Sequence, residues 1–145
     1  MKTLLKTILV FTVLFLIVKS IILVPADEKI KRKLLLIEEE VKEMGYDTEW
    51  IVISEKRGKW YNSILPNSNK KSSHHLSGKA IDIYLFDIND DGKYDIEDVN
   101  IIEVANNRVE RKNRDLVGAF GTYMNEGYFD KHMIHLDVSG KKRKY

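Results

Sequence analysis

Two histidines and an aspartate have the spacing of a three-ligand metal site. His75 is followed seven positions later by Asp82, and His135 lies 53 positions beyond that aspartate. Two imidazoles and one carboxylate leave the fourth position of a tetrahedral zinc ion open for water, which is the arrangement of catalytic zinc sites. The residue types and their spacing therefore predict a zinc-dependent hydrolase.

Each of these residues also has an ordinary explanation. A histidine in a serine-rich loop is commonly a surface residue, which applies to His75 and to its neighbour His74, and we interpret His74 as a bystander. Asp82 differs, because a carboxylate between apolar neighbours is costly to bury unless it is paired or binds a metal. The alternative for Asp82 is a buried salt bridge. Taken together, the three residues favour a metal, with zinc preferred.

Asp82 and His135 are both expected on the polar face of a β-strand. Apolar and polar residues alternate along the segments 80–86 and 133–138, which predicts two half-buried strands. The polar face of the second strand also carries Asp137. Both strands thus offer possible ligands on the face opposite the core, and their expected core residues are Ile81, Ile83, Leu85, Ile134, Leu136 and Val138.

The remaining pattern predicts an α+β fold. An amphipathic helix is expected over 27–44, with Asp27 as its N-cap, and a strand over 48–54, which is rich in β-branched and aromatic residues. The polar segment 58–73 is rich in turn residues and predicts a loop, and a further helix is expected over 96–106. We expect a small antiparallel sheet that carries the site, flanked by the first helix and two later helical segments.

The first 26 residues are apolar and membrane-directed. A basic start, the 12 uncharged residues 7–18 and the small-residue ending at Ala26 suit a secretory signal peptide cleaved after Ala26. The 21 residues 4–24 also suit an uncleaved membrane anchor, with Lys19 reaching towards the interface. A buried cytosolic helix is the less favoured alternative. Residues 27–145 are therefore expected as one extracytoplasmic domain, secreted or anchored to the membrane.

Composition excludes several classes of function. The formal charge of +2 belongs to the N-terminal segment, because residues 27–145 contain 21 basic and 22 acidic side chains. No basic stripe argues for nucleic-acid binding. The chain has no cysteine, so it forms no disulfide and zinc must be held by nitrogen and oxygen. The basic ending 141–144 is interpreted as a solvated tail, in preference to a wall- or lipid-binding segment.

The metal motif closely resembles that of a known family. Ser73-x-His75-x-x-Gly78-x-Ala80-x-Asp82, followed by Ile134-His135-Leu136-Asp137-Val138, is similar to the zinc D-Ala-D-Ala carboxypeptidase and murein endopeptidase family, which shares its fold with lysostaphin-type peptidases and the hedgehog signalling domain. The resemblance covers about Trp50 to Val138. It implies that His75, Asp82 and His135 bind zinc. It also implies that Arg57 takes the place of an arginine that binds substrate or stabilises the oxyanion.

The chain departs from this family at the catalytic base. Many relatives carry a glutamate three positions before the last ligand and a tryptophan just before it, where this chain has His132 and Ile134. A neutral imidazole can accept a proton from zinc-bound water, so His132 is the predicted base, provided that the strand begins after it. Glu126 is the reserve candidate. Asp137 is expected to orient an imidazole ligand as a supporting residue.

A second motif predicts calcium binding. Residues 87–98 match the 12-residue EF-hand loop, with Gly92 at its sharp turn, and they resemble the calcium loop and helix of dockerin modules. The alternative is an acidic turn in which Asp95 caps the next helix. A dockerin has two such loops, so one loop does not support binding to cohesin. The expected ligands are Asp87, Asn89, Asp91, Lys93 through its carbonyl, Asp95 and Asp98.

Two classes of function follow from these motifs. The first is an extracytoplasmic zinc metallopeptidase that cleaves D-amino-acid-containing peptide bonds of peptidoglycan. Carboxypeptidase and endopeptidase action, on D,D- or L,D-bonds, all agree with the motif. The alternative is a non-catalytic zinc- and calcium-binding module of hedgehog-like fold at the cell surface. A base within reach of metal-bound water distinguishes the two.

Overall fold

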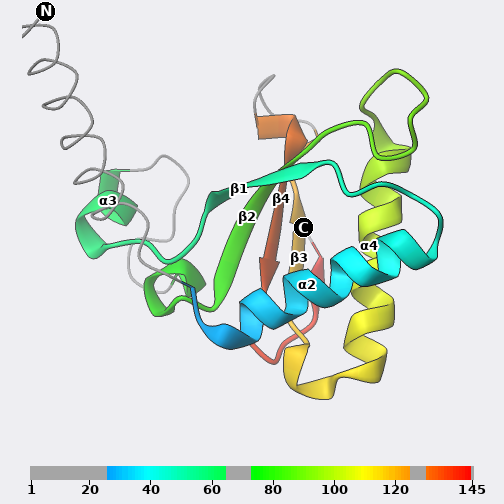
Figure 1. Ribbon diagram of the computed structural model, residues 1–145. Coiled ribbons are helices and arrows are strands. Elements are labelled where there is room, and N and C mark those ends of the chain that lie inside the picture. The colour runs from blue at the N-terminus through cyan, green and yellow to red at the C-terminus, as the bar shows by residue number, and fades with distance from the viewer. Residues whose placement is uncertain (1–25, 65–72, 125–129, 145) are drawn as a thin grey trace, which may run out of the picture.

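Five strands from distant parts of the sequence form one mixed sheet (Figure 1). The computed structural model describes residues 26–64, 73–124 and 130–144. The strands lie in the order β1-β2-β4-β3-β5, and all neighbouring pairs are antiparallel except β3 and β5. The α+β class is confirmed, but the predicted antiparallel sheet is mixed, because the last strand runs parallel to β3. The strands are β1 (Trp50–Ser54), β2 (Ala80–Leu85), β3 (Ala119–Thr122), β4 (Met133–Asp137) and β5 (Arg143–Lys144).

The helices confirm two predictions and add one element. The first predicted helix is α2 (Glu28–Glu43), and the helix expected to end at 106 is α4, which continues to Lys112 (Ile96–Lys112). A short helix, α3 (Lys59–Ile64), lies within the segment predicted as a loop. Three short 3-10 turns complete the described chain: η1 (His74–Ser77), η2 (Arg114–Leu116) and η3 (Asp130–His132).

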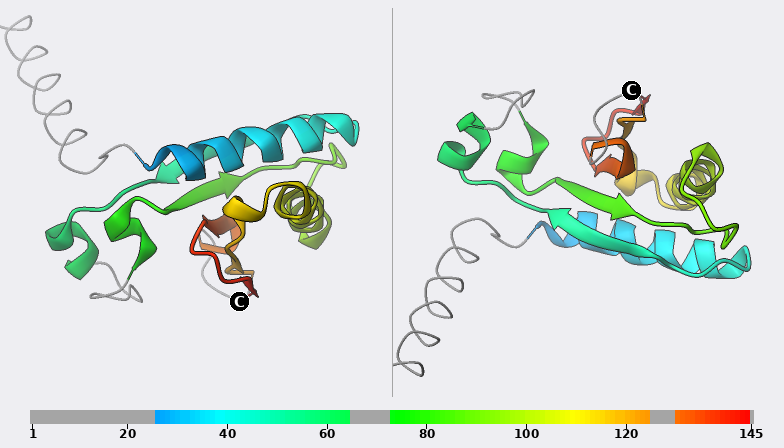
Figure 2. Two further views of the ribbon diagram at one scale, coloured as in Figure 1. Left: turned by 90° about the horizontal axis from the view of Figure 1, so that it is seen from below. Right: turned by 90° about the horizontal axis from the view of Figure 1, so that it is seen from above.

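Local sequence explains where α2 begins and which face it buries. The Asp27 side chain accepts a hydrogen bond from the Lys29 amide at 2.9 Å and caps the helix. Gly45, at φ 89°, follows the end of the helix in the left-handed conformation. The helix runs alongside β1 and β2, whereas α4 is seen nearly end-on in the same view (Figure 2). The buried residues of α2 are Ile30, Lys33, Ile37, Glu40 and Val41.

The hydrophobic core lies between the sheet and these two helices. All six strand residues expected in the core are buried, each at most 8% exposed. They pack with apolar residues of α2 and α4, and α2 also packs directly against α4. The alternation of the sequence therefore turns the core side of β2 and β4 towards the helices. It leaves Asp82 and His135 on the opposite side of the strands.

The structure describes the C-terminal segment but almost none of the predicted N-terminal membrane-directed segment. No helix within residues 26–64, 73–124 and 130–144 is long and apolar enough to cross a membrane. The predicted signal peptide or anchor lies outside the described residues, apart from Ala26. The basic ending is exposed, as expected, but it is not a free tail. Arg143 and Lys144 form β5, and Lys144 Nζ contacts the Glu103 carboxylate of α4 at 2.7 Å.

Candidate metal centre

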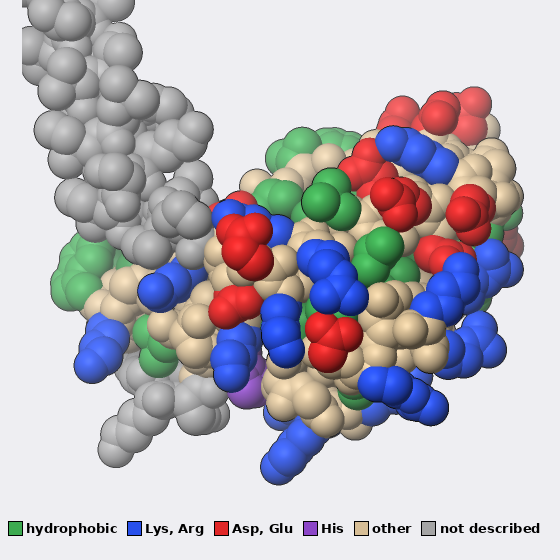
Figure 3. Space-filling view, turned by 60° about the horizontal axis from the view of Figure 1, so that its bottom comes forward, with side chains coloured by type: hydrophobic (Ala, Val, Ile, Leu, Met, Phe, Trp, Pro, Cys, Tyr) green, Lys and Arg blue, Asp and Glu red, His purple; other side chains and the backbone are tan. Residues whose placement is uncertain are grey.

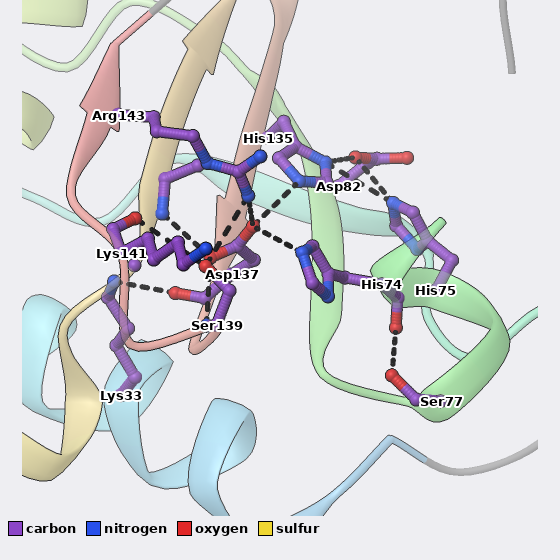
Figure 4. Close-up of polar contacts among 12 residues, drawn as sticks. Lys33, His74, His75, Ser77, Asp82, His135, Asp137, Ser139, Lys141 and Arg143 are labelled. Carbon is purple, nitrogen blue, oxygen red and sulfur yellow. Dashed lines mark hydrogen bonds and ion pairs between the residues drawn. The ribbon is translucent and has the colours of Figure 1, made fainter. Parts of the chain in front are cut away.

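Three side chains from three elements point to one place (Figure 4). His75 lies on η1, and Asp82 and His135 lie directly opposite each other on β2 and β4. Asp82 Oδ1 is 3.1 Å from His75 Nε2 and 2.8 Å from His135 Nδ1, and the two nitrogens are 3.3 Å apart. All three residues are buried, with 2%, 5% and 8% exposure in chain order. The predicted ligands therefore converge as the sequence pattern requires.

The backbone around η1 fixes the position of His75. Gly78 ends this turn at φ 72°, and a Cβ there would lie 3.2 Å from the Asp27 amide nitrogen, so the turn favours glycine. The same Asp27 amide donates to the Gly78 carbonyl at 2.9 Å. On the other side, the Arg57 amide donates to the His75 carbonyl at 2.9 Å. The turn is thus held between the start of α2 and the segment after β1.

A backbone carbonyl sets the tautomer of His75. His75 Nδ1 is 2.8 Å from the Glu55 carbonyl oxygen, which only accepts hydrogen bonds, so Nδ1 carries the proton. In neutral His75 the lone pair is then on Nε2, the atom that faces Asp82 Oδ1. Two acceptors at 3.1 Å need a proton or another cation between them. This is the hydrogen-bond arrangement that histidine ligands of metals adopt.

Asp137 stands beside the outer nitrogen of His135. Asp137 Oδ2 is 3.9 Å from His135 Nε2, while Nδ1 of the same ring faces Asp82. The Asp137 carboxylate is fully buried, and its Oδ1 accepts from the Ala119 amide at 2.7 Å and the Ser139 amide at 3.0 Å. Asp137 therefore lies where a residue that orients the His135 ring is expected.

Charge in this cluster favours a bound cation. Burial alone would raise the pKa of Asp82, but its close contacts with the His135 and His75 rings hold that pKa well below its usual range. Burial would likewise lower the pKa of His135, but its contacts with Asp137 and Asp82 raise it. Both carboxylates therefore remain ionised and attract a positive charge to the histidines. Either a proton on His135 or a metal ion can supply that charge.

The donor set and its dimensions fit zinc. Ligand atoms around a tetrahedral zinc lie roughly 3.3 Å apart, because Zn–N and Zn–O bonds are about 2.0–2.2 Å. The three interatomic distances of 2.8, 3.1 and 3.3 Å are close to this value. Two imidazoles and a carboxylate suit a borderline-soft ion such as zinc better than calcium or magnesium, which favour oxygen ligands.

Arg57 contacts the other oxygen of Asp82. Its guanidinium forms an ion pair with Asp82 Oδ2, and its Nε donates to Ser54 Oγ at 2.7 Å. The pairing of β1 with β2 shifts its register between Val52 and Ser54. Because of this irregularity, Ser54 lies opposite Asp82. The salt bridge considered as the alternative for Asp82 is thus present, but it occupies Oδ2 and leaves Oδ1 to the histidines. Arg57 therefore lies beside the site, and the substrate-binding role that the resemblance implies stays a prediction.

His132 lies outside the three-residue cluster. It is the last residue of η3, and β4 begins at Met133. The strand therefore begins after His132, as its predicted role as the base requires. Its ring stacks on Tyr94 at 3.9 Å and on Tyr84 at 4.8 Å between centroids, and its Nδ1 is 2.9 Å from the Leu85 carbonyl. Tyr84 shares the strand face of Asp82. Through Tyr84, the His132 ring lies beside the face of β2 that carries Asp82, two residues along the strand from it, and Glu126 falls outside the described residues.

His74, the expected bystander, also faces Asp137. Its Nε2 is 3.9 Å from Asp137 Oδ2, and its side chain is 34% exposed, compared with 3% for His75. Arg143 reaches the same oxygen at 3.1 Å. Many Lys and Arg side chains lie on the face drawn in Figure 3, with some Asp and Glu side chains among them. Arg143 therefore brings a positive charge to the exposed edge of the centre, beside the buried carboxylate of Asp137.

The 87–98 loop has an EF-hand-like internal hydrogen-bond pattern. Asp87 accepts from the Asp91 amide at 3.2 Å and the Gly92 amide at 2.7 Å, and Gly92 has φ 88°. Asp95 caps α4, as expected if the loop is a helix-starting turn, but this capping does not exclude calcium, because position 9 of the EF-hand also precedes a helix. Asp98 is fully buried and accepts from the Ile88 amide at 2.7 Å.

The loop carboxylates are not gathered as closely as the zinc ligands. Within the described ranges, His75, Asp82 and His135 are the only set of three or more His, Cys, Asp or Glu side chains whose ligand atoms all lie within 4.8 Å. The Lys93 ammonium lies 3.5 Å from Asp91 and also pairs with Asp95. Calcium binding therefore requires these carboxylates to draw together and to release Lys93.

Some residues near the centre were not predicted from the sequence. Arg143 belongs to the segment 141–144, for which the sequence predicts a solvated tail, and Lys33 occupies a position on the buried stripe of α2. A lysine three residues after Ile30 was a detectable signal, because it interrupts the apolar face of an amphipathic helix. Its partner Glu110 lies 77 residues away, and the sequence contains no sign of that pairing.

Comparison of the chain with protein families, with curated proteins and with solved structures found no match. The case for function therefore depends on the geometry of the centre and on the motif that predicted it.

Proposed function

We propose that this protein is an extracytoplasmic zinc metallopeptidase that cleaves D-amino-acid-containing peptide bonds of peptidoglycan. The observation that carries the proposal is the convergence of Asp82 Oδ1, His75 Nε2 and His135 Nδ1 within 4.8 Å in a buried position. Hydrogen bonding directs the lone pair of His75 to this point, and the nearby Asp137 favours the same for His135. Three acceptors that face one another require a cation.

A zinc ion held by these three residues would supply Lewis-acid chemistry for hydrolysis of a peptide bond. Arg57 has two tasks in the proposal. It neutralises Asp82 Oδ2 and so directs Oδ1 towards the histidines. A guanidinium has five N–H donors in a fixed plane, so Arg57 is also suited to bind a substrate carbonyl or carboxylate at the same time.

His132 is the proposed general base, with Glu126 in reserve. The stacked tyrosines hold its ring in one plane, and the Leu85 carbonyl fixes the proton on Nδ1. The lone pair of the neutral ring is then on Nε2, the nitrogen that is able to take a proton. A base held by stacking would compensate for the missing glutamate.

The choice of peptidoglycan rests on the motif and on the positive charge of Arg143. Stem peptides carry free carboxylates, and Arg143 and His74 lie at the exposed edge of the centre. A membrane-directed N-terminal segment would bring the domain to the compartment that contains this substrate. Carboxypeptidase and endopeptidase action both remain within the proposal.

Digestion of purified peptidoglycan tests the function. The zinc-loaded full chain, kept in detergent, is expected to release peptides whose new termini are identified by mass spectrometry. His75→Ala and Asp82→Ala should bind no zinc at ordinary metal levels and should release nothing, because two ligands do not hold the ion. His74→Ala is the matched control, since it removes the neighbouring imidazole and should retain stoichiometric zinc.

Two outcomes would count against the proposal in different ways. Near-stoichiometric zinc in purified His75→Ala or Asp82→Ala would contradict the ligand assignment. If zinc-loaded wild-type protein cleaved none of the peptidoglycans tested, the result would contradict the proposed peptidase activity. It would favour the non-catalytic module of hedgehog-like fold.

We also propose that the 87–98 loop binds calcium and thereby fixes the exit of β2 and the start of α4. The support is the Asp87 and Gly92 turn geometry, together with oxygen-bearing residues at the expected loop positions.

A further inference from the structure

A fully buried ion pair joins α2 to α4 beneath the end of β4. Lys33 has no exposed surface, and its Nζ donates to Glu110 Oε1 at 2.8 Å, while the Glu110 side chain is 3% exposed. Burial lowers the pKa of Lys33, although the nearby charge of Glu110 opposes the shift. Buried ion pairs are commonly no more stabilising than apolar residues of similar size. Net stability is therefore a poor explanation for this one.

The pair holds the backbone of Asp137. Lys33 Nζ also donates to the Asp137 carbonyl oxygen at 2.9 Å, the contact visible in Figure 4. Glu110 Oε1 accepts from the Gly118 amide at 3.1 Å. A Cβ at Gly118 would lie 1.9 Å from the same Asp137 carbonyl oxygen, so this close approach is open only to glycine. We call Lys33, Glu110 and Gly118 the Asp137 brace.

The brace continues into the metal centre through the Asp137 side chain. The next amide, that of Ala119, donates to Asp137 Oδ1 at 2.7 Å. This bond leaves Oδ2 on the side of His135, whose Nε2 is 3.9 Å away. Hydrogen bonds thus connect α2 and β3 to Asp137, and an ion-pair contact connects Asp137 to the His135 imidazole. The helices on the core side of the sheet are linked to a ligand on its other side.

We infer that the Asp137 brace positions Asp137 so that its carboxylate orients His135 for metal binding. Lys33, Glu110 and Gly118 are positioning residues in this account, because they act through Asp137 and touch neither metal nor substrate. The inference rests on the proposed zinc site. Loss of an outer partner of a metal-binding histidine usually weakens metal affinity about 10–100-fold.

The test replaces the buried pair without leaving a buried charge. Lys33→Met/Glu110→Gln removes both charges and the donor to the Asp137 carbonyl, while the glutamine oxygen is still able to accept from the Gly118 amide. Zinc affinity is measured on the full chain by competition with a chelator. The visible spectrum of the cobalt(II)-substituted protein reports the ligand geometry. We expect zinc affinity to fall about 10–100-fold and the cobalt spectrum to change.

The matched control removes an exposed link between α2 and η2, the turn that follows α4. Arg32 is adjacent to Lys33 and contacts Asp115 of η2 at 3.3 Å. Arg32→Met/Asp115→Asn should leave zinc affinity and the cobalt spectrum as in wild type, even if it lowers the melting temperature. An equal loss of affinity in this control would overturn the inference, because general loosening of α2 would then explain the effect.

A coupling experiment tests whether the brace acts through Asp137. Asp137→Asn should weaken zinc binding, and adding Lys33→Met/Glu110→Gln to it should cause little further loss. Fully additive losses would contradict the brace. Wild-type zinc affinity and an unchanged cobalt spectrum in the folded Lys33→Met/Glu110→Gln protein would also overturn it, while the zinc assignment would stand. If wild-type protein bound no zinc, the proposed function itself would fail.

Discussion

At the scale of single residues, the centre depends on which atom of each side chain faces inward. The Glu55 carbonyl directs His75 Nε2 to the cluster, and Arg57 reserves Asp82 Oδ1 for the two histidines. Alternation along the strands predicted that Asp82 and His135 lie on the face opposite the core. Their direct pairing, and the turn that brings His75 to them, are seen only in the structure. The sequence did not predict Lys33 and Glu110, because their pairing depends on how two helices cross beneath β4.

The catalytic base provides the first prediction. His132→Phe should preserve stacking between Tyr84 and Tyr94, retain zinc, and lower turnover of peptidoglycan peptides about 10²–10⁴-fold, because the aromatic ring remains and the proton acceptor is lost. Steady-state rates and zinc content of the purified variant check this. Full activity in His132→Phe, with activity lost in Glu126→Gln, would assign the base to Glu126.

At the scale of elements, the sequence predicts the helices and strands that have a clear periodic pattern, but not the two short strands β3 and β5. The segments that became α2, β2, β4 and α4 have clear helical or alternating patterns, and the structure contains all four. β3 contains Gly121 and is four residues long, and β5 has two residues, so neither has a recognisable strand pattern. Both strands depend on tertiary pairing, β3 with β4 and β5 with β3.

The calcium loop gives a prediction at this scale. Asp87→Ala/Asp91→Ala should abolish the rise in melting temperature that calcium causes in wild-type protein, because a ligand that binds only the folded state stabilises it by mass action. Asp90→Asn is the matched control. It removes one negative charge from a loop position that is not a ligand, and asparagine tolerates the φ of 56° found there. Thermal unfolding with calcium and with a chelator gives the comparison.

An unchanged calcium response in Asp87→Ala/Asp91→Ala would show that the loop is only a helix-starting turn. An equal loss in Asp90→Asn would attribute the response to general charge screening.

At the scale of the whole molecule, stability should depend on pH in opposite ways with and without zinc. The pKa of His135 is raised from 6.5, so its protonation stabilises the zinc-free fold below pH 6.5, and this stabilisation is lost as the pH rises through the folded-state pKa. The pKa values of Asp82 and Asp137 lie below 3.8, so their contribution is present above pH 3.8 and is lost as the pH falls through the folded-state values.

Zinc-free protein should therefore be most stable between pH 3.8 and 6.5, with a decline above that window. Zinc binding requires neutral His135, so the zinc-saturated protein should instead gain stability as the pH rises from about 5 to 7. Melting temperatures measured with chelator and with excess zinc check the two slopes. Parallel slopes in the two series would mean that zinc and the proton on His135 do not compete.

The central claim is that His75, Asp82 and His135 hold one zinc ion, and a crystal structure of the zinc-loaded protein tests it most directly. Anomalous scattering at the zinc absorption edge locates the ion without assumptions about its ligands. We expect one buried zinc bound by His75 Nε2, Asp82 Oδ1 and His135 Nδ1, at about 2.0–2.2 Å, with a fourth position open to water. A zinc peak elsewhere, or an ion that lacks any of these three ligands, would contradict the account.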